Sequence, residues 1–162
     1  MFKILLINMM LSLSIMAQTF NFTELRYSDA IGKTIELHGE ITFVKDGLSI
    51  NYPKTKRVLK YSGDTLVYEV DKQEVELGLM QQMQIKNYFD MLILLHSGDE
   101  SALNEMFELE KKDAMMMLRA KGSIKDYITK IELLKQNKQL DFVKLFLTNN
   151  DTIMITIDEK IR

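Results

Sequence analysis

The fold prediction rests first on residues 34–77, which read TIELHGEITFVKDGLSINYPKTKRVLKYSGDTLVYEVDKQEVEL. The first ten alternate: Ile35, Leu37, Gly39, Ile41 and Phe43 fall on one side of an extended chain, and polar residues fall on the other. This period of two is typical of a strand with one face in water. Turn signals then divide the stretch into further strands, predicted at residues 48–52, 57–61, 65–70 and 74–77. We expect an antiparallel sheet that cups an apolar ligand.

The start of the chain is typical of an export signal. Lys3 supplies a positive charge, residues 4–16 are apolar, and Ala17 is a small residue suited to a cleavage site. The apolar run is shorter than the roughly 20 residues of a membrane span. We therefore expect residues 1–17 to be a signal peptide, cleaved or retained as an anchor. Residues 18–162 then form a single domain in the periplasm.

The composition excludes two classes of protein. The 162 residues contain no cysteine, which rules out a disulfide scaffold. The formal net charge is −2 and no basic stripe occurs, so nucleic acid is not an expected partner.

After residue 77 the apolar spacing changes. Residues 79–96 carry a polar face and an apolar face at helical spacing, so we predict an amphipathic helix, intact or broken near Gln84. Gly98 suits a helix end and Asp99 suits the N-cap of a second helix, at residues 100–106. Residues 20–28 are ambiguous between the end of a helix and an edge strand. Strands are predicted again at residues 107–110, 114–119, 128–134, 140–147 and 152–157.

One part of this second group is ambiguous. Ile124, Ile128, Ile131 and Leu134 also fit a helical stripe, but the spacing of the turn signals favours a strand. Helices inserted between two groups of strands must bury their apolar side against the sheet. The predicted fold is therefore mainly β (α+β): a curved antiparallel sheet with a short helical lid.

The motifs of catalysis and metal binding do not occur. The two histidines, His38 and His96, lack the companion ligands of a zinc site, and we expect both to be solvated. No nucleophile elbow, P-loop or dinucleotide-binding motif is present. We expect no enzyme activity, no metal and no cofactor.

The apolar content suggests a binding role. Eight of the 12 methionines follow residue 17, and methionine adapts to guests of variable shape. Residues 115–118 and 140–147 are apolar on both faces, so these strands need cover on both sides or a partner. Two interpretations remain open at this point: an ordinary core, and a cavity for acyl chains.

Four segments resemble a known family. They are Gly39–Lys45, Leu48–Pro53, residues 58–68 and Leu92–Phe107 with its Ser97-Gly98-Asp99 break. Together, the span from Glu40 to Ile157 resembles the LolA family of periplasmic carriers, which move lipoproteins from the inner to the outer membrane. The resemblance implies an unclosed β-barrel covered by helices around an apolar cavity. That cavity would be lined by Ile35, Leu37, Ile41, Phe43, Met80, Met83, Met91, Leu92 and Leu95.

The resemblance is incomplete. Family members carry Arg-Pro in the first turn, where the Arg helps to hold the lid closed, but this chain has Lys45-Asp46-Gly47. The expected function is transport of lipoprotein acyl chains by a monomer, with an inner-membrane release complex and an outer-membrane acceptor as partners implied by the resemblance. Alternatives are a carrier of another lipid, such as an aryl-polyene lipid or a glycolipid, and a periplasmic protein-interaction module.

Overall fold

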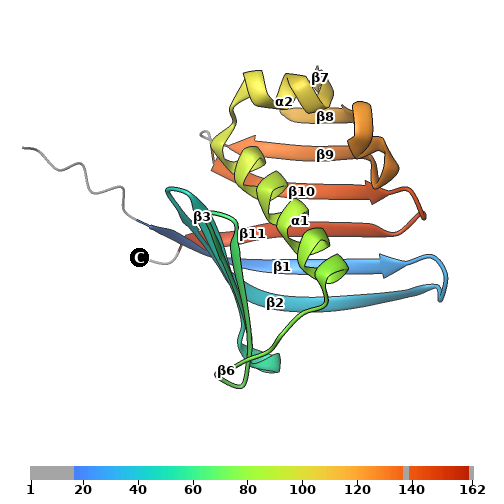
Figure 1. Ribbon diagram of the computed structural model, residues 1–162. Helices are drawn as coiled ribbons and strands as arrows, with labels where there is room; N and C mark the ends of the chain where they lie inside the picture. Colours follow the sequence, from blue (N-terminus) through green and yellow to red (C-terminus); the bar gives the residue numbers. More distant parts are fainter. Residues whose placement is uncertain (1–16, 137–138, 161–162) are drawn as a thin grey trace, which may run out of the picture.

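The computed structural model describes residues 17–136 and 139–160 (Figure 1). The predicted signal peptide, apart from Ala17, lies outside the described residues. Within them, the chain forms one antiparallel sheet of eleven strands and two α-helices. The sheet is curved and unclosed, because its edge strands β6 and β7 do not pair with each other. The prediction of a mainly β protein with an unclosed curved sheet is confirmed.

The sheet grows outward from its centre in two series of hairpins, in the order β6-β5-β4-β3-β2-β1-β11-β10-β9-β8-β7. The first series consists of β1 (Gln18–Ser28), β2 (Lys33–Val44), β3 (Gly47–Tyr52), β4 (Arg57–Ser62), β5 (Thr65–Val70) and β6 (Gln73–Glu74). The second consists of β7 (Phe107–Lys112), β8 (Met115–Ala120), β9 (Ile128–Gln136), β10 (Gln139–Leu147) and β11 (Thr152–Lys160). The first and last strands therefore pair with each other in the middle of the sheet.

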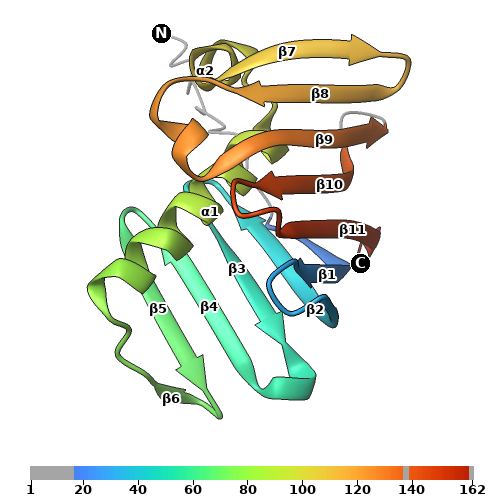
Figure 2. The ribbon, with the colours of Figure 1, turned by 90° about the vertical axis from the view of Figure 1, so that its right-hand side faces the viewer.

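Helix α1 (Leu79–Ser97) lies across the concave side of the sheet and joins the two series of strands (Figures 1 and 2). It ends at Gly98, whose φ of 69° is readily adopted only by glycine. The short helix α2 (Glu100–Met106) follows, and the Asp99 side chain accepts hydrogen bonds from the backbone N–H groups of Ser101 and Ala102. This is the N-cap that the sequence predicts.

The core consists of two clusters of buried side chains, and α1 contributes to both. Phe89 and Leu92 pack with β1–β4 and β11, whereas Met91 and Leu95 pack with α2 and β7–β10. Successive turns of one helix thus cover both parts of the sheet, β1–β4 with β11 and β7–β10. The arrangement explains why a 19-residue helix is inserted between the two strand series.

Two local predictions are wrong, and the alternative left open for the helix at residues 79–96 is settled. Residues 20–28 belong to β1, which is neither part of a helix nor an edge strand but pairs with both β2 and β11. The strand predicted at residues 74–77 stops at Glu74, because the chain must leave the sheet to begin α1. Helix α1 is continuous through Gln84. The strand prediction for residues 128–134 is confirmed. Residues 122–126 before this strand form a short 3₁₀ helix, as do Pro53–Thr55 between β3 and β4.

Candidate ligand-binding site on the concave face

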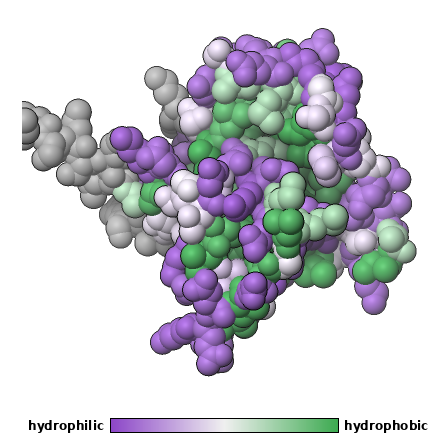
Figure 3. All heavy atoms as spheres, viewed as in Figure 1, coloured by the Kyte–Doolittle hydropathy of each residue, from purple (hydrophilic) through white to green (hydrophobic). Residues whose placement is uncertain are grey.

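The two halves of α1 differ sharply in burial. Phe89, Leu92 and Leu95 are at most 2% exposed. In the first turns, Leu79 is 76% exposed, Met80 75% and Met83 56%. We call Leu79, Met80 and Met83 the apolar cap; Figure 3 shows hydrophobic residues at the surface in the region of α1. Grouped exposed apolar side chains of this kind mark candidate interaction surfaces.

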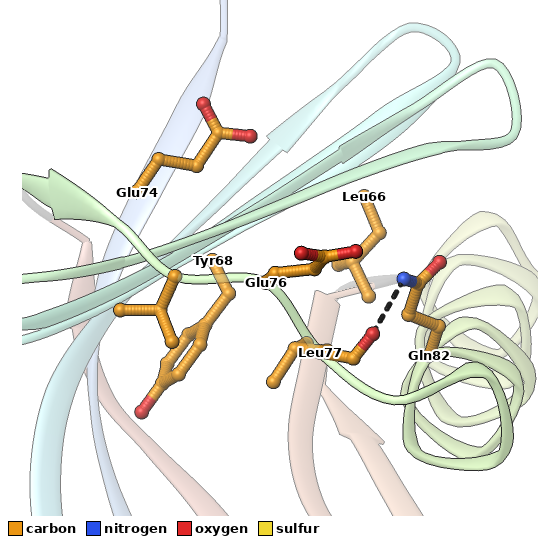
Figure 4. A pocket seen from close by; sticks show the side chains of 7 residues that line it. Leu66, Tyr68, Glu74, Glu76, Leu77 and Gln82 are labelled. Atoms are coloured by element: carbon orange, nitrogen blue, oxygen red, sulfur yellow. Dashed lines mark hydrogen bonds between the residues drawn. The ribbon is translucent and has the colours of Figure 1, made fainter.

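A pocket of about 370 Å³ lies between β5, the segment that leads into α1, and Gln82 of α1. It is lined by Leu66 and Tyr68 of β5, by residues 74–77 and by Gln82 of α1 (Figure 4). We call this space the α1 pocket. Gln82 Nε2 donates a hydrogen bond of 2.8 Å to the carbonyl oxygen of Leu77, which ties the connecting segment to the helix. The volume falls at the lower end of the roughly 300–1,000 Å³ typical of ligand pockets.

A cluster of polar side chains is buried under the middle of α1. Glu24 of β1 is fully buried, and its Oε2 accepts a 2.6 Å hydrogen bond from the Tyr52 hydroxyl. Its Oε1 accepts a hydrogen bond from Arg26 Nε, which also forms an ion pair. A buried carboxylate is costly unless it is paired and hydrogen-bonded, and these two partners meet that need.

Gly39 allows this cluster to form. It lies on β2, between β1 and β3, opposite Phe22. A Cβ atom at Gly39 would lie 2.8 Å from the Phe22 ring and 2.5 Å from the carbonyl oxygen of Asn51, closer than real Cβ contacts. Because no side chain intervenes, the Phe22 and Tyr52 rings meet edge-to-face with centroids 5.7 Å apart. Tyr52 can then reach Glu24 across the intervening strand.

Tyr88 is the residue of α1 that belongs to the same cluster. Its hydroxyl is buried and has no hydrogen-bond partner among the described residues. Burial raises the pKa of Tyr88 well above its usual value, and the negative charge of Glu24 raises it further. Burial and Glu24 also raise the pKa of Tyr52, although Arg26 opposes this. Glu24, Arg26, Tyr52 and Tyr88 therefore form one electrostatically coupled unit, the polar cluster.

The predicted cavity residues do not form a single lining. Five of them are at most 6% exposed and pack in the core: Ile41, Phe43, Met91, Leu92 and Leu95. Ile35, Met80 and Met83 are each more than half exposed, and Leu37 is half-buried at the edge of the core. Their role in lipid binding stays a prediction.

Sequence reasoning missed both the α1 pocket and the polar cluster. The alternation of Leu66 and Tyr68 in a predicted strand was a usable signal for the pocket. The cluster left no local signal, because Glu24 and Tyr52 are 28 residues apart.

The two histidines lie in different environments. His38 is exposed on the outer side of β2, as predicted. His96 is not simply solvated: its ring stacks on Phe43, with centroids 3.7 Å apart and planes 6° from parallel. Burial lowers the pKa of His96, and the positive charge of Lys135 lowers it further. Within the described residues, no three His, Asp or Glu side chains are placed to hold a metal ion.

Comparison with models of known protein families and with curated proteins gives no match for this chain. The resemblance to the LolA family therefore stays a prediction. None of the helices in the described part of the chain has the length and hydropathy that a membrane span needs.

Proposed function

We propose that the protein is a non-catalytic carrier of an acyl-bearing lipid. The observation that supports this most is the exposed apolar cap in the first turns of α1, the helix whose Gln82 lines the α1 pocket. An acyl chain lying along the first turns of α1 would cover Leu79, Met80 and Met83 and enter the pocket beside Leu66. Each CH₂ group removed from water contributes about 0.8 kcal/mol, so a chain of moderate length needs no specific polar contact to bind.

In this proposal α1 acts as a lid on an unclosed, barrel-like sheet. The carboxyl-terminal half of α1 is anchored by Phe89, Leu92 and Leu95, whereas its first turns bury little apolar surface. The weakly held end opens first, because local opening costs least where few apolar contacts must break. Opening would extend the α1 pocket along the concave face toward the residues that the sequence predicts for the cavity.

The cargo follows from the resemblance to the LolA family. We propose acyl chains of lipoproteins moved from the inner to the outer membrane, with export of the chain to the periplasm and membrane partners at both ends. Another lipid of similar chain length would fit the same site. Identification of the lipid that copurifies with the protein distinguishes these cargoes.

The test replaces one side chain of the apolar cap. Met83→Glu places a charge in the proposed path of the acyl chain, and we expect at least a tenfold weaker uptake of a fluorescent fatty acid, since stranding a charge beside a bound chain costs more than about 1.4 kcal/mol. Met83 is exposed, so the fold should survive. The matched control is Met115→Glu, because Met115 is 40% exposed on β8, away from the cap.

Uptake in the control should equal that of the unchanged protein. The carrier proposal fails if the purified protein neither retains a lipid detectable by mass spectrometry nor takes up the fatty acid. A stable complex with another protein that Met83→Glu disrupts, in a molecule free of lipid, would favour the protein-interaction alternative. Leu92→Glu is not a suitable probe, because Leu92 is 1% exposed and its replacement would disrupt the core.

A further inference from the structure

The polar cluster has an unusual combination of groups for the interior of an apolar concavity. The Arg26–Glu24 ion pair uses Nε, the inner nitrogen of the guanidinium group. The side chain of Arg26 is 47% exposed, so part of its guanidinium group can meet a further partner. Glu24 is fully buried, and its Oε1 accepts the hydrogen bond from Arg26 Nε.

A second guanidinium group approaches the same tyrosine. The Cζ atom of Arg57, on β4, lies 5.3 Å from the centre of the Tyr52 ring. Arg57 Nε donates a 2.8 Å hydrogen bond to the Thr55 hydroxyl, and Arg57 forms no ion pair with any residue that the structure describes. Because Glu24 offsets only one of the two arginines, the polar cluster and Arg57 together carry one surplus positive charge.

The Tyr88 hydroxyl is a third hydrogen-bond donor, and it has no acceptor among the described residues. It is buried, and Tyr88 packs against the core cluster that contains Tyr52. Buried hydroxyl groups are normally hydrogen-bonded, and an unpaired one calls for an explanation. An acceptor supplied by a ligand would satisfy it.

The register connects this cluster to the α1 pocket. Arg57 pairs with Tyr52 on one side and with Val70 on the other, and Tyr68 of the pocket lies on the same face of β5 as Val70. The pocket itself carries carboxylates: Glu76 lies beside Leu66, while Glu74 is turned away from it (Figure 4). The two ends of this path therefore differ in charge, with acidic groups at the pocket and arginines at the cluster.

We propose that Arg26, Arg57 and Tyr88 form a subsite for an anionic head group, and that the ligand of this protein is a carboxylate- or phosphate-bearing amphiphile. This inference rests on the proposed lipid-binding function. The arginines bind the head group, since the guanidinium fork matches carboxylate and phosphate oxygens. The carboxylates at the pocket repel the head group, so the acyl chain occupies the pocket end.

The experiment compares dodecanoate with its uncharged amide by titration calorimetry at pH 8, with acetate as a probe of the head group alone. The unchanged protein should bind dodecanoate about tenfold more tightly than the amide, because hydrogen bonds to charged groups are worth roughly that factor. Arg57→Gln should reduce the ratio to about threefold or less. Lys54→Gln, which removes an exposed positive charge from the neighbouring 3₁₀ helix, should leave the ratio unchanged.

A second variant keeps the test independent of any folding defect in the first. Tyr88→Phe removes one donor and should weaken the binding of dodecanoate more than that of the amide, with circular dichroism confirming the fold. Equal affinity for both probes in the unchanged protein, or an unchanged ratio in Arg57→Gln, would overturn the subsite while leaving the carrier function intact. Saturable binding of acetate as tight as that of dodecanoate would assign the site to free anions instead. Failure of both dodecanoate and the amide to bind contradicts the carrier function itself.

Discussion

At the residue scale, the concave face consists of an apolar core that contains one group of charged and polar side chains, the polar cluster. Glu24 occupies a core-facing position of β1, in line with the buried side chains of Phe20 and Phe22. It is tolerated because Tyr52 and Arg26 both donate to it. The Tyr88 hydroxyl, in contrast, is buried without a hydrogen-bond partner among the described residues, so it does not stabilise the ligand-free protein. Two tyrosines of one cluster should therefore respond oppositely to the loss of their hydroxyl groups.

We expect Tyr88→Phe to stabilise the empty protein by about 1 kcal/mol, because it removes an unsatisfied buried donor and keeps the ring. For a chain of this length the melting temperature should rise by roughly 2–4 °C. Tyr52→Phe is the matched control: it breaks the hydrogen bond to the Glu24 carboxylate and should cost about 1.5–3 kcal/mol. Thermal denaturation followed by circular dichroism measures both. Destabilisation by Tyr88→Phe would show that its hydroxyl has a partner after all.

At the element scale, the end of α1 is fixed by its surroundings as well as by its own sequence. Gly98 ends the helix, and Lys135 Nζ of β9 reaches the carbonyl oxygen of His96 at 3.5 Å. A positive charge at this end also interacts favourably with the helix dipole. His96, in the last turn, packs flat on Phe43 of β2. The carboxyl-terminal end of α1 thus contacts strands of both series, β2 and β9.

Acid should weaken this attachment. Burial and Lys135 hold the pKa of His96 below the value of 6.5 that it has in the unfolded chain. The unfolded state therefore binds the proton more readily, and the stability that neutral His96 contributes is present above pH 6.5 and is lost as the pH falls through the lower folded pKa. We expect a lower urea midpoint at pH 5.5 than at pH 7.5 and a smaller difference in His96→Phe. His38→Gln, at the exposed histidine, should keep most of the difference; an equal reduction there would refute the assignment.

At the scale of the whole molecule, the sheet is built from its centre outward. Strands β1 and β11 pair with each other, and each has a further neighbour on its other side. The edges are β6, only two residues long, and β7. Central strands contribute to both core clusters, whereas β6 buries no side chain and β7 buries only Phe107. Stability should therefore decrease from the middle of the sheet toward its edges.

Hydrogen exchange of the native protein tests this gradient. We expect the amides of β1 and β11 to exchange slowest, through global unfolding, and those of β5 and β6 to exchange faster, through local opening. If the first turns of α1 open as proposed, their amides should also exchange faster than those near Leu92 and Leu95. Uniform protection across the sheet and along α1 would contradict both expectations.

Much of the secondary structure follows from local patterns. The alternation through Ile41 and Phe43 predicts β2, and both side chains are buried. Asp99 and Gly98 mark the boundary between the two helices where the structure has it. The central strand β1 escapes this reasoning because Glu24 stands where the pattern calls for an apolar residue. Val75 and Leu77 look like strand residues, but the start of α1 removes them from the sheet.

The sequence by itself determined most of the strands, the two helices and the mainly β class, because alternation, helical spacing and caps act between residues close in the chain. Only the tertiary structure decided that β1 lies at the centre, that five predicted cavity residues are core, and that a charged cluster lies under α1. These features depend on contacts between distant residues, and whether an apolar side chain faces another side chain or open space is set by packing rather than by its own type.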